Sequence, residues 1–183
     1  MNRTNRRIAE ESKQKIGNAL FTLMKVYHFR EITVTQLTQE AELSRKTFYR
    51  LFSDKDEVLN IVFDTLFYEF FAQIKTRNIR HYWDLVQLYF DFWESRKEML
   101  FLLGKNDLLG RMFEYVYRSA EKIFIAVRTS EKAEEFAEPL PYLLAYSVGG
   151  MHSMLIKWVE SGITVPSSVL TAQLKAGFTS PEL

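Results

Sequence analysis

Polar side chains able to contact a nucleic acid lie together in the segment SRKTFYR, residues 44–50. Arginine and lysine can donate hydrogen bonds to guanine edges or phosphates, threonine offers a hydroxyl or a methyl group, and a tyrosine hydroxyl can reach a phosphate oxygen. At helical spacing the neighbouring apolar residues share one face, so these polar residues occupy the other. The predicted outward face consists of Arg45, Lys46, Thr47, Tyr49 and Arg50.

Capping signals predict the helices that place this face. Thr33 has the position of an N-cap with Gln36 three residues later, which predicts a helix from about residue 34 to residue 41. Ser44 caps the next helix, and Ser53 with the acidic residues after it marks the start of another. Two short helices joined by a tight turn are typical of the helix-turn-helix, whose second helix enters the DNA major groove.

Lys55 is unusual for its position, since it stands at the start of the long helix predicted for residues 54–75 and helix starts favour acidic residues. A cation there suits a phosphate that the helix amides also attract. The alternative interpretation is that a short helix with a charged outer face is merely soluble, as most amphipathic helices are. The capped helix pair, the turn, the basic face and Lys55 occur together, and this combination favours DNA recognition.

The spacing of apolar residues predicts an all-α fold of about nine helices. The chain has 183 residues, only seven glycines and four prolines, and apolar residues that recur every three or four positions. We expect a three-helix head, residues 1–53, followed by a larger helical bundle, residues 54–183. Helices beyond the long one are predicted at residues 82–95, 97–103, 108–128, 140–161 and 167–178.

The first helix is predicted from the same spacing. Its buried face is expected to consist of Ile16, Leu20, Leu23 and Tyr27, with Ile8 added if the helix reaches that far back. The arginines before it are compatible with a loose arm.

Formal charge separates the two parts of the chain. Residues 1–53 hold ten Lys/Arg against five Asp/Glu, whereas residues 54–183 hold fourteen against eighteen. A basic head on an acidic body indicates a polyanionic partner for the head alone. The chain has no cysteine and no apolar signal segment, which favours the cytoplasm. Because His152 and Lys157 interrupt the longest apolar tract, residues 139–159, we expect no membrane span.

The segment ITVTQLTQEAELSRKTFYRLFSDKDEVL, residues 32–59, resembles the DNA-binding region of the TetR family of bacterial transcription regulators. With the preceding helix, the likeness covers about residues 12–60. The resemblance implies a homodimer with a DNA-binding head on each subunit and a helical body that often senses a small molecule. By position, Thr33 and Thr35 would start the second helix near phosphates, and Tyr49 and Lys55 would hold the DNA backbone. The expected DNA-binding set is Thr33, Thr35, Ser44, Arg45, Lys46, Thr47, Tyr49, Arg50 and Lys55.

Two residues depart from the family pattern. Glu42, in the turn, and Lys46, in the third helix, stand where the family often has glycine. If the turn requires a left-handed residue, Glu42 costs about 1 kcal/mol relative to glycine. Lys46 adds bulk and charge toward the DNA, so an operator sequence cannot be borrowed from the family.

Aromatic residues gather in the body, where 21 of the 27 lie beyond residue 57. They can line a pocket for an apolar or aromatic effector, or they can simply fill the core, which is the commoner use of such stripes. Asp91 and Glu94 lie among three aromatic residues but also belong to a polar stripe of one helix, so we expect them to face solvent rather than to form a cage for a cation. His81 and His152 can contact a ligand or serve as hydrogen-bonded structural residues.

The last two predicted helices suggest an interface between two subunits. Gly149 and Gly150 lie in the middle of a helix, where each costs about 1 kcal/mol relative to alanine, and close backbone approach would offset that cost. An intramolecular core helix is the alternative. The residues expected at a four-helix dimer interface are Leu144, Val148, Met151, Leu155, Trp158, Leu170 and Leu174.

The function expected from these features is that of a dimeric DNA-binding transcriptional repressor, released from a palindromic operator by an effector bound in the body. The chain has no glycine-rich phosphate loop, no metal-spaced His/Cys/Glu set and no nucleophile with a base, so we predict that it is not an enzyme and uses no cofactor or metal. The alternative is a helical ligand carrier or protein-interaction adaptor that never touches DNA.

Overall fold

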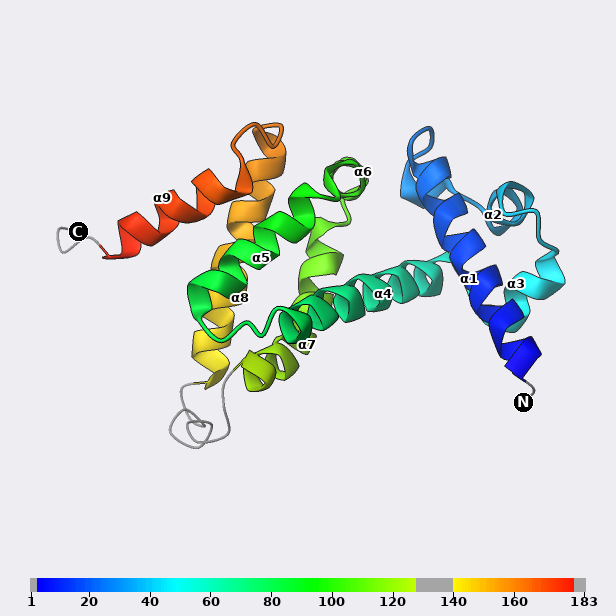
Figure 1. Ribbon diagram of the computed structural model, residues 1–183. Helices are drawn as coiled ribbons and strands as arrows, with labels where there is room; N and C mark the ends of the chain where they lie inside the picture. Colours follow the sequence, from blue (N-terminus) through cyan, green and yellow to red (C-terminus); the bar gives the residue numbers. More distant parts are fainter. Residues whose placement is uncertain (1–2, 128–139, 180–183) are drawn as a thin grey trace. The chain divides into compact units, whose positions relative to one another are not determined.

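The computed structural model describes residues 3–127 and 140–179, and these residues form nine α-helices and one 3-10 helix without any strand (Figure 1). The predicted all-α fold is therefore confirmed. The helices are α1 (Arg3–Met24), η1 (Phe29–Glu31), α2 (Val34–Glu40), α3 (Arg45–Leu51), α4 (Lys55–Thr76), α5 (Tyr82–Glu94), α6 (Lys97–Lys105), α7 (Leu109–Val127), α8 (Leu140–Glu160) and α9 (Ser167–Thr179).

The predicted caps determine where the short helices begin. Thr33 caps α2 in a reciprocal arrangement: its side chain accepts from the backbone N–H of Gln36, and the Gln36 side chain accepts from the backbone N–H of Thr33. At the start of α4, the Asp54 carboxylate accepts from the N–H of Glu57 at 2.8 Å. Such bonds satisfy backbone donors that a helix start otherwise leaves without partners. The helix starts at 34, 45 and 55 follow directly from them.

The first helix differs from its prediction at both ends. It begins at Arg3, so the arginines expected as a loose arm belong to the helix, and it ends at Met24. Met24 is fully buried, while Tyr27 lies beyond the helix and is exposed. Ile8 is also exposed, so it does not extend the buried face of α1. The buried stripe of α1 therefore continues from Leu20 to Met24 and not to Tyr27. The spacing of apolar residues alone did not predict this.

The chain divides into a first unit, Met1–Leu66, and a second unit, Phe67–Leu183. The division lies within α4, whereas the sequence placed it between residues 53 and 54. The first half of α4 contributes Leu59 and Phe63 to the buried side chains of the first unit. α1 packs closely on this half, because a Cβ atom at Gly17 would lie 3.3 Å from a methyl group of Val62.

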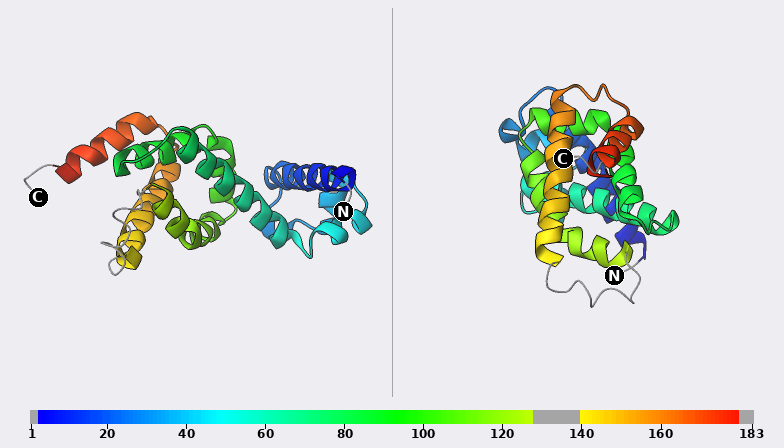
Figure 2. Two further views of the ribbon diagram at one scale, coloured as in Figure 1. Left: turned by 60° about the horizontal axis from the view of Figure 1, so that its bottom comes forward. Right: turned by 90° about the vertical axis from the view of Figure 1, so that its left-hand side faces the viewer.

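In the second unit, α9 lies along α5, and α7 lies beside α8 (Figures 1 and 2). Phe90 of α5 and Trp158 of α8 meet edge to face in the core, with ring centroids 5.6 Å apart. α6 approaches α8 where a Cβ atom at Gly104 would lie 3.2 Å from Val159. Aromatic edge-to-face contacts of this kind add to the burial of apolar area in holding the helices together.

The α5 carboxylates expected to face solvent instead fix the start of α9. The buried hydroxyl of Ser167 lies 2.7 Å from a carboxylate oxygen of Asp91 and 2.7 Å from one of Glu94. The backbone N–H of Ser167 also donates to Glu94. Negative charge at a helix N-terminus is favourable, so the two carboxylates anchor α9 on α5. Across the described helices, none combines the length and the apolar character needed to cross a bilayer.

Candidate nucleic-acid interface

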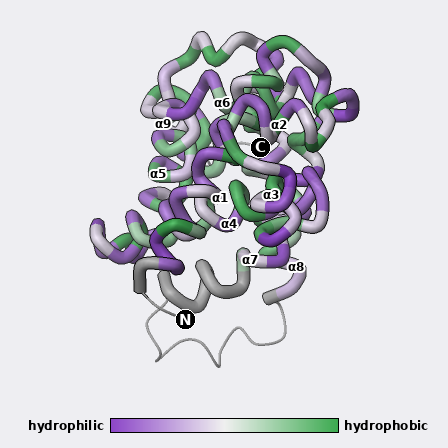
Figure 3. Tube along the Cα trace, turned by 90° about the vertical axis from the view of Figure 1, so that its right-hand side faces the viewer, coloured by the Kyte–Doolittle hydropathy of each residue, from purple (hydrophilic) through white to green (hydrophobic). Residues whose placement is uncertain are grey.

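The helix α3 presents a polar face to solvent and buries an apolar one. Its start is capped by Ser44, whose hydroxyl oxygen accepts from the N–H of Thr47 at 3.0 Å. On the inner face Phe48 is 0% exposed and its ring lies 5.3 Å from that of Phe52. Figure 3, in which hydrophilic residues are purple and hydrophobic ones green, shows both kinds along α3. The structure has the predicted outward face except at Thr47, which is half-buried and serves the cap.

The outward residues of α3 form what we call the basic face, made of Arg45, Lys46, Tyr49 and Arg50. All four are exposed, whereas Thr47 is half-buried. The Tyr49 ring is 53% exposed and rests edge-on against Phe48, with centroids 5.4 Å apart. The Arg45 guanidinium lies over the same ring at 5.9 Å. Tyr49 is thereby held between the core and Arg45, which places a cation and a phenol hydroxyl side by side on the surface.

The turn between α2 and α3 requires a left-handed residue. Glu42 has φ 54°, and the N–H of Leu43 donates to the carbonyl of Thr38 at 2.9 Å. This bond across the helix end is the pattern that glycine usually makes possible. The conditional expectation for Glu42 is thus met, and the turn has the conformation in which a side chain is strained.

The start of α2 presents two exposed threonines, Thr33 and Thr35. The hydroxyl of Thr33 donates to the Gln36 side chain at 2.8 Å, so it serves the cap. Thr35 is exposed on the first turn of α2. These two residues lie in the first unit with the basic face, as the sequence expected.

Lys55 has a different place from the one expected. Its ammonium group donates to three backbone carbonyls, those of Phe29 at 2.7 Å, Arg30 at 2.7 Å and Ile32 at 2.9 Å. Burial lowers the pKa of Lys55, and the neighbouring Asp56 carboxylate offsets part of this effect. An ammonium group carries three N–H donors, so these carbonyls occupy all of them. The sequence could not reveal this partner, which lies more than twenty residues earlier in the chain.

The residues expected at a dimer interface divide into two sets. Leu155 is 0% exposed and Trp158 is 3% exposed, and Val148 is also buried, so these three belong to the core of the second unit. The indole N–H of Trp158 donates to the carbonyl of Val165. The prediction that they lie at a dimer interface is wrong. α8 is apolar on most of its sides, and periodicity alone selected the side that faces the core. Leu144, Met151, Leu170 and Leu174 are half-buried and remain partly accessible.

The outer side of α8 carries residues that the expected interface did not include. Tyr142 is 81% exposed and Tyr146 is 63% exposed, and a Cβ atom at Gly149 or Gly150 would meet nothing within 4 Å. The Tyr146 ring contacts Phe178 of α9 at 6.5 Å. We call this stripe the outer face of α8. The two tyrosines at helical spacing ahead of the glycines were the sequence signal for it.

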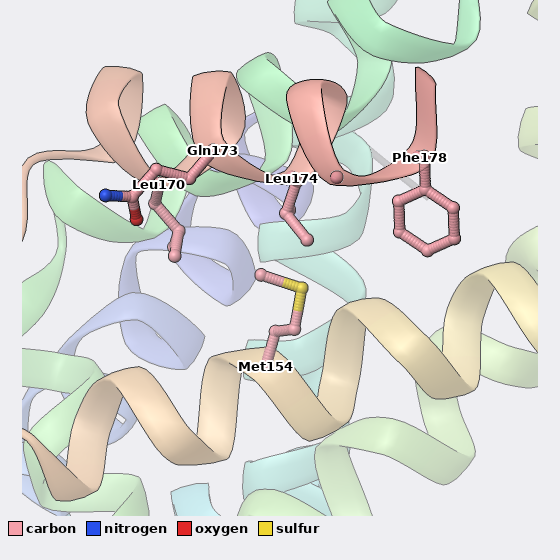
Figure 4. Close-up of a pocket in the computed structure, with 6 residues that line it drawn as sticks. Met154, Leu170, Gln173, Leu174 and Phe178 are labelled. Carbon is pink, nitrogen blue, oxygen red and sulfur yellow. The ribbon is translucent and has the colours of Figure 1, made fainter. Parts of the chain in front are cut away.

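An apolar groove of about 330 Å³ lies between α8 and α9 (Figure 4). Met154 points from α8 toward Leu170 and Leu174 of α9, and Phe178 stands at one end. This groove is next to the outer face of α8. A half-exposed apolar surface of this kind is typical of protein interfaces.

Of the aromatic residues whose role the sequence left open, several belong to the core. Phe90, Phe92 and Trp93 are buried in α5, and the Arg96 guanidinium lies over the Phe92 ring, 3.9 Å from its centroid. His152 stacks on Phe113 with centroids 4.5 Å apart, and burial lowers its pKa. His81 is exposed at the start of α5.

Comparison with known proteins identifies no relative: no protein-family model matches the chain, and no curated protein matches it.

Proposed function

We propose that the protein is a dimeric DNA-binding transcription regulator that acts in the cytoplasm as a repressor. The observation that carries this proposal is the basic face of α3, which is exposed, rigidly capped and preceded by a short helix and a tight turn. An exposed helix of this kind fits the major groove, where Arg and Lys can contact base edges and phosphates. The resemblance of residues 32–59 to the TetR family supports the same reading.

Dimerisation would give the head its specificity. Two α3 helices held about 34 Å apart, or at a multiple of that spacing, match successive major grooves of a palindromic operator. The outer face of α8 and the groove beside α9 support an interface in the second unit, because they are apolar and exposed in the protomer. This replaces the inner α8 residues that the sequence selected.

Release from the operator would follow from an effector bound in the second unit. Such a ligand shifts the dimer off DNA only as far as it binds better to a conformation with differently spaced heads. The resemblance to the TetR family and the many half-buried aromatic residues of the second unit support this step.

Fluorescence anisotropy with a labelled duplex of random sequence tests the proposal. We expect binding that weakens about a hundredfold as salt rises from about 50 to about 200 mM, because phosphate contacts release counterions. An absence of binding at both salt concentrations would instead favour a ligand carrier or adaptor. Binding that is insensitive to salt would also contradict the proposal, since the basic face would then not contact phosphates.

A further inference from the structure

Lys55 connects the first residue of α4 to the segment before α2. Its Nζ atom lies 2.7 Å from the carbonyl oxygen of Phe29, 2.7 Å from that of Arg30 and 2.9 Å from that of Ile32. The same ammonium group lies 5.0 Å from the centroid of the Phe29 ring. Hydrogen bonds from a charged donor are about twice as strong as neutral ones, so this group of contacts is a strong tertiary link within the first unit.

The three carbonyls belong to the place where the chain turns into α2. η1 spans Phe29–Glu31, and Thr33, the N-cap of α2, follows two residues later. The Phe29 carbonyl also accepts the N–H of Ile32 at 3.3 Å, so the Lys55 ammonium adds a tertiary bond to the local one that closes η1. The position of Thr33, and with it the direction in which α2 starts, therefore depends on where Lys55 holds this segment.

Lys55 is also poorly suited to hold a DNA phosphate. To donate to a phosphate oxygen it would have to give up at least one of three short bonds, and the carbonyl concerned would then lose its charged donor. Hydrogen bonds to a charged group contribute more than neutral ones, so giving one up is costly. Lys46 lies in the same unit, is exposed on the basic face, and needs no such exchange.

We propose that Lys55 is a positioning residue for DNA binding. It holds the start of α2 against the first turn of α4, and because the α2–α3 turn joins α2 to α3, it thereby fixes the position of the basic face. This inference rests on the proposed function. α4 continues from the first unit into the second. A displacement of its first turn would therefore move the start of α2.

The test compares Lys55→Met with the matched variant Lys46→Met, since both remove one ammonium group and keep an unbranched side chain. Hydrogen exchange is first measured on the free, full-length protein without DNA. For Lys55→Met we expect the amides of residues 29–33 to exchange at least about tenfold faster than in the wild type, because their tertiary link is lost. For Lys46→Met we expect wild-type exchange in this segment.

Duplex affinity is then measured over a range of salt concentrations. Lys55→Met should weaken binding about tenfold, because the basic face is less well preorganised. The slope of log affinity against log salt should stay that of the wild type, because no phosphate contact is lost. Lys46→Met should make that slope shallower by about 0.9 for each phosphate contact removed.

The inference is overturned if Lys55→Met makes the slope shallower as Lys46→Met does and leaves exchange of residues 29–33 unchanged, because Lys55 would then contact a phosphate. If the wild type binds no duplex at any salt concentration, the proposed function fails and the role of Lys55 in DNA binding fails with it. These two failures are distinct, because the first occurs only in a protein that binds DNA.

A second variant covers the case in which Lys55→Met does not fold. Lys55→Gln keeps an amide that can donate to some of the three carbonyls. The hydrogen-exchange rate of the amides of residues 29–33 should therefore lie between that of the wild type and that of an unprotected chain. Wild-type exchange and wild-type affinity in Lys55→Gln would count against the inference.

Discussion

Strain at a single residue gives the turn between α2 and α3 a measurable signature. Glu42 has φ 54° and is exposed, so glycine would relieve the left-handed conformation without removing packing. We predict that Glu42→Gly raises the free energy of unfolding by about 1 kcal/mol in urea denaturation. Glu40→Gly, two residues earlier in α2, should lower it, because the same change in a helical residue is unfavourable. Equal effects of the two changes would contradict the assigned turn.

The start of α4 should show a pH dependence that resides in Glu57. Hydrogen bonds from the N–H of Ser53 at 2.6 Å and from its hydroxyl at 2.8 Å lower the pKa of the Glu57 carboxyl. A lowered folded-state pKa means that this stabilisation is complete above the pKa of the unfolded chain and is lost as pH falls through the folded-state pKa. We predict that Glu57→Gln removes this part of the acid dependence, by less than about 1 kcal/mol because solvent screens the site. Wild-type acid dependence in urea titrations of Glu57→Gln would refute the assignment.

The residues of the candidate interface were predictable where their neighbours in sequence decide their position. The basic face followed from helical spacing around Phe48, and the cap followed from Thr33 and Gln36. The role of Lys55 was not predictable, because its acceptors are carbonyls of η1 and of Ile32, which only the folded first unit brings near. The local sequence pattern predicts on which face of a helix a side chain lies, whereas its hydrogen-bond partners depend on the tertiary structure.

Among the helices, two hydroxyls one turn apart on α9 should respond to substitution in opposite ways. Ser167 serves the carboxylates of Asp91 and Glu94, whereas the buried hydroxyl of Thr171 has no hydrogen-bond partner within the described part of the chain. Ser167→Ala should lower the free energy of unfolding by about 1–3 kcal/mol, since the hydroxyl that bridges the two carboxylates is lost, although Asp91 keeps the amide of Gln87 and Glu94 keeps the N–H of residue 167. Thr171→Val should raise it by roughly 1 kcal/mol, since an unsatisfied group is removed. The same sign for both in urea denaturation would contradict this description of the α5–α9 contact.

The glycines of α8 provide a test of the proposed dimer interface. Nothing in the described protomer lies within 4 Å of a Cβ at Gly150, so alanine fits there and should stabilise the helix by up to about 1 kcal/mol. If a second subunit packs on this face, Gly150→Ala should also raise the dimer dissociation constant about tenfold, because overpacking an interface costs about 1–3 kcal/mol. Sedimentation equilibrium measures this constant. Gly110→Ala on α7, which also meets open space, serves as the control and should leave it unchanged.

Helix positions were the most predictable feature of the fold, and helix faces were less so. Side-chain caps at Thr33 and Ser44 mark the starts of α2 and α3, and Gly162, with φ 79°, follows the end of α8, so these boundaries lie close to their predicted positions. The inner face of α8 was mistaken for an interface because apolar residues surround the helix, and a pattern without a polar side cannot say which side meets the core. Tertiary contacts such as that between Phe90 and Trp158 decide the question.

At the level of the whole molecule, the charge asymmetry lies within the first unit rather than between the two units. Residues 1–53 hold ten Lys/Arg against five Asp/Glu, residues 54–66 hold one against four, and the second unit holds thirteen against fourteen. The attraction to a polyanion would therefore come from the part of the first unit that contains the exposed basic face of α3. α4 is the helix that the two units share.

The most direct test of the central claim is the salt-dependent duplex affinity of a variant that lacks the cations of the basic face. The variant Arg45→Ala, Lys46→Ala, Arg50→Ala is compared with a control that removes as many exposed cations from the second unit, Lys97→Ala, Arg118→Ala, Lys157→Ala. We predict that the first loses at least about a hundredfold in affinity and has a slope shallower by about 2–3 per head, while the control keeps wild-type values. Equal losses in the two variants, or wild-type affinity in the first, would contradict the claim that α3 is the surface that contacts DNA.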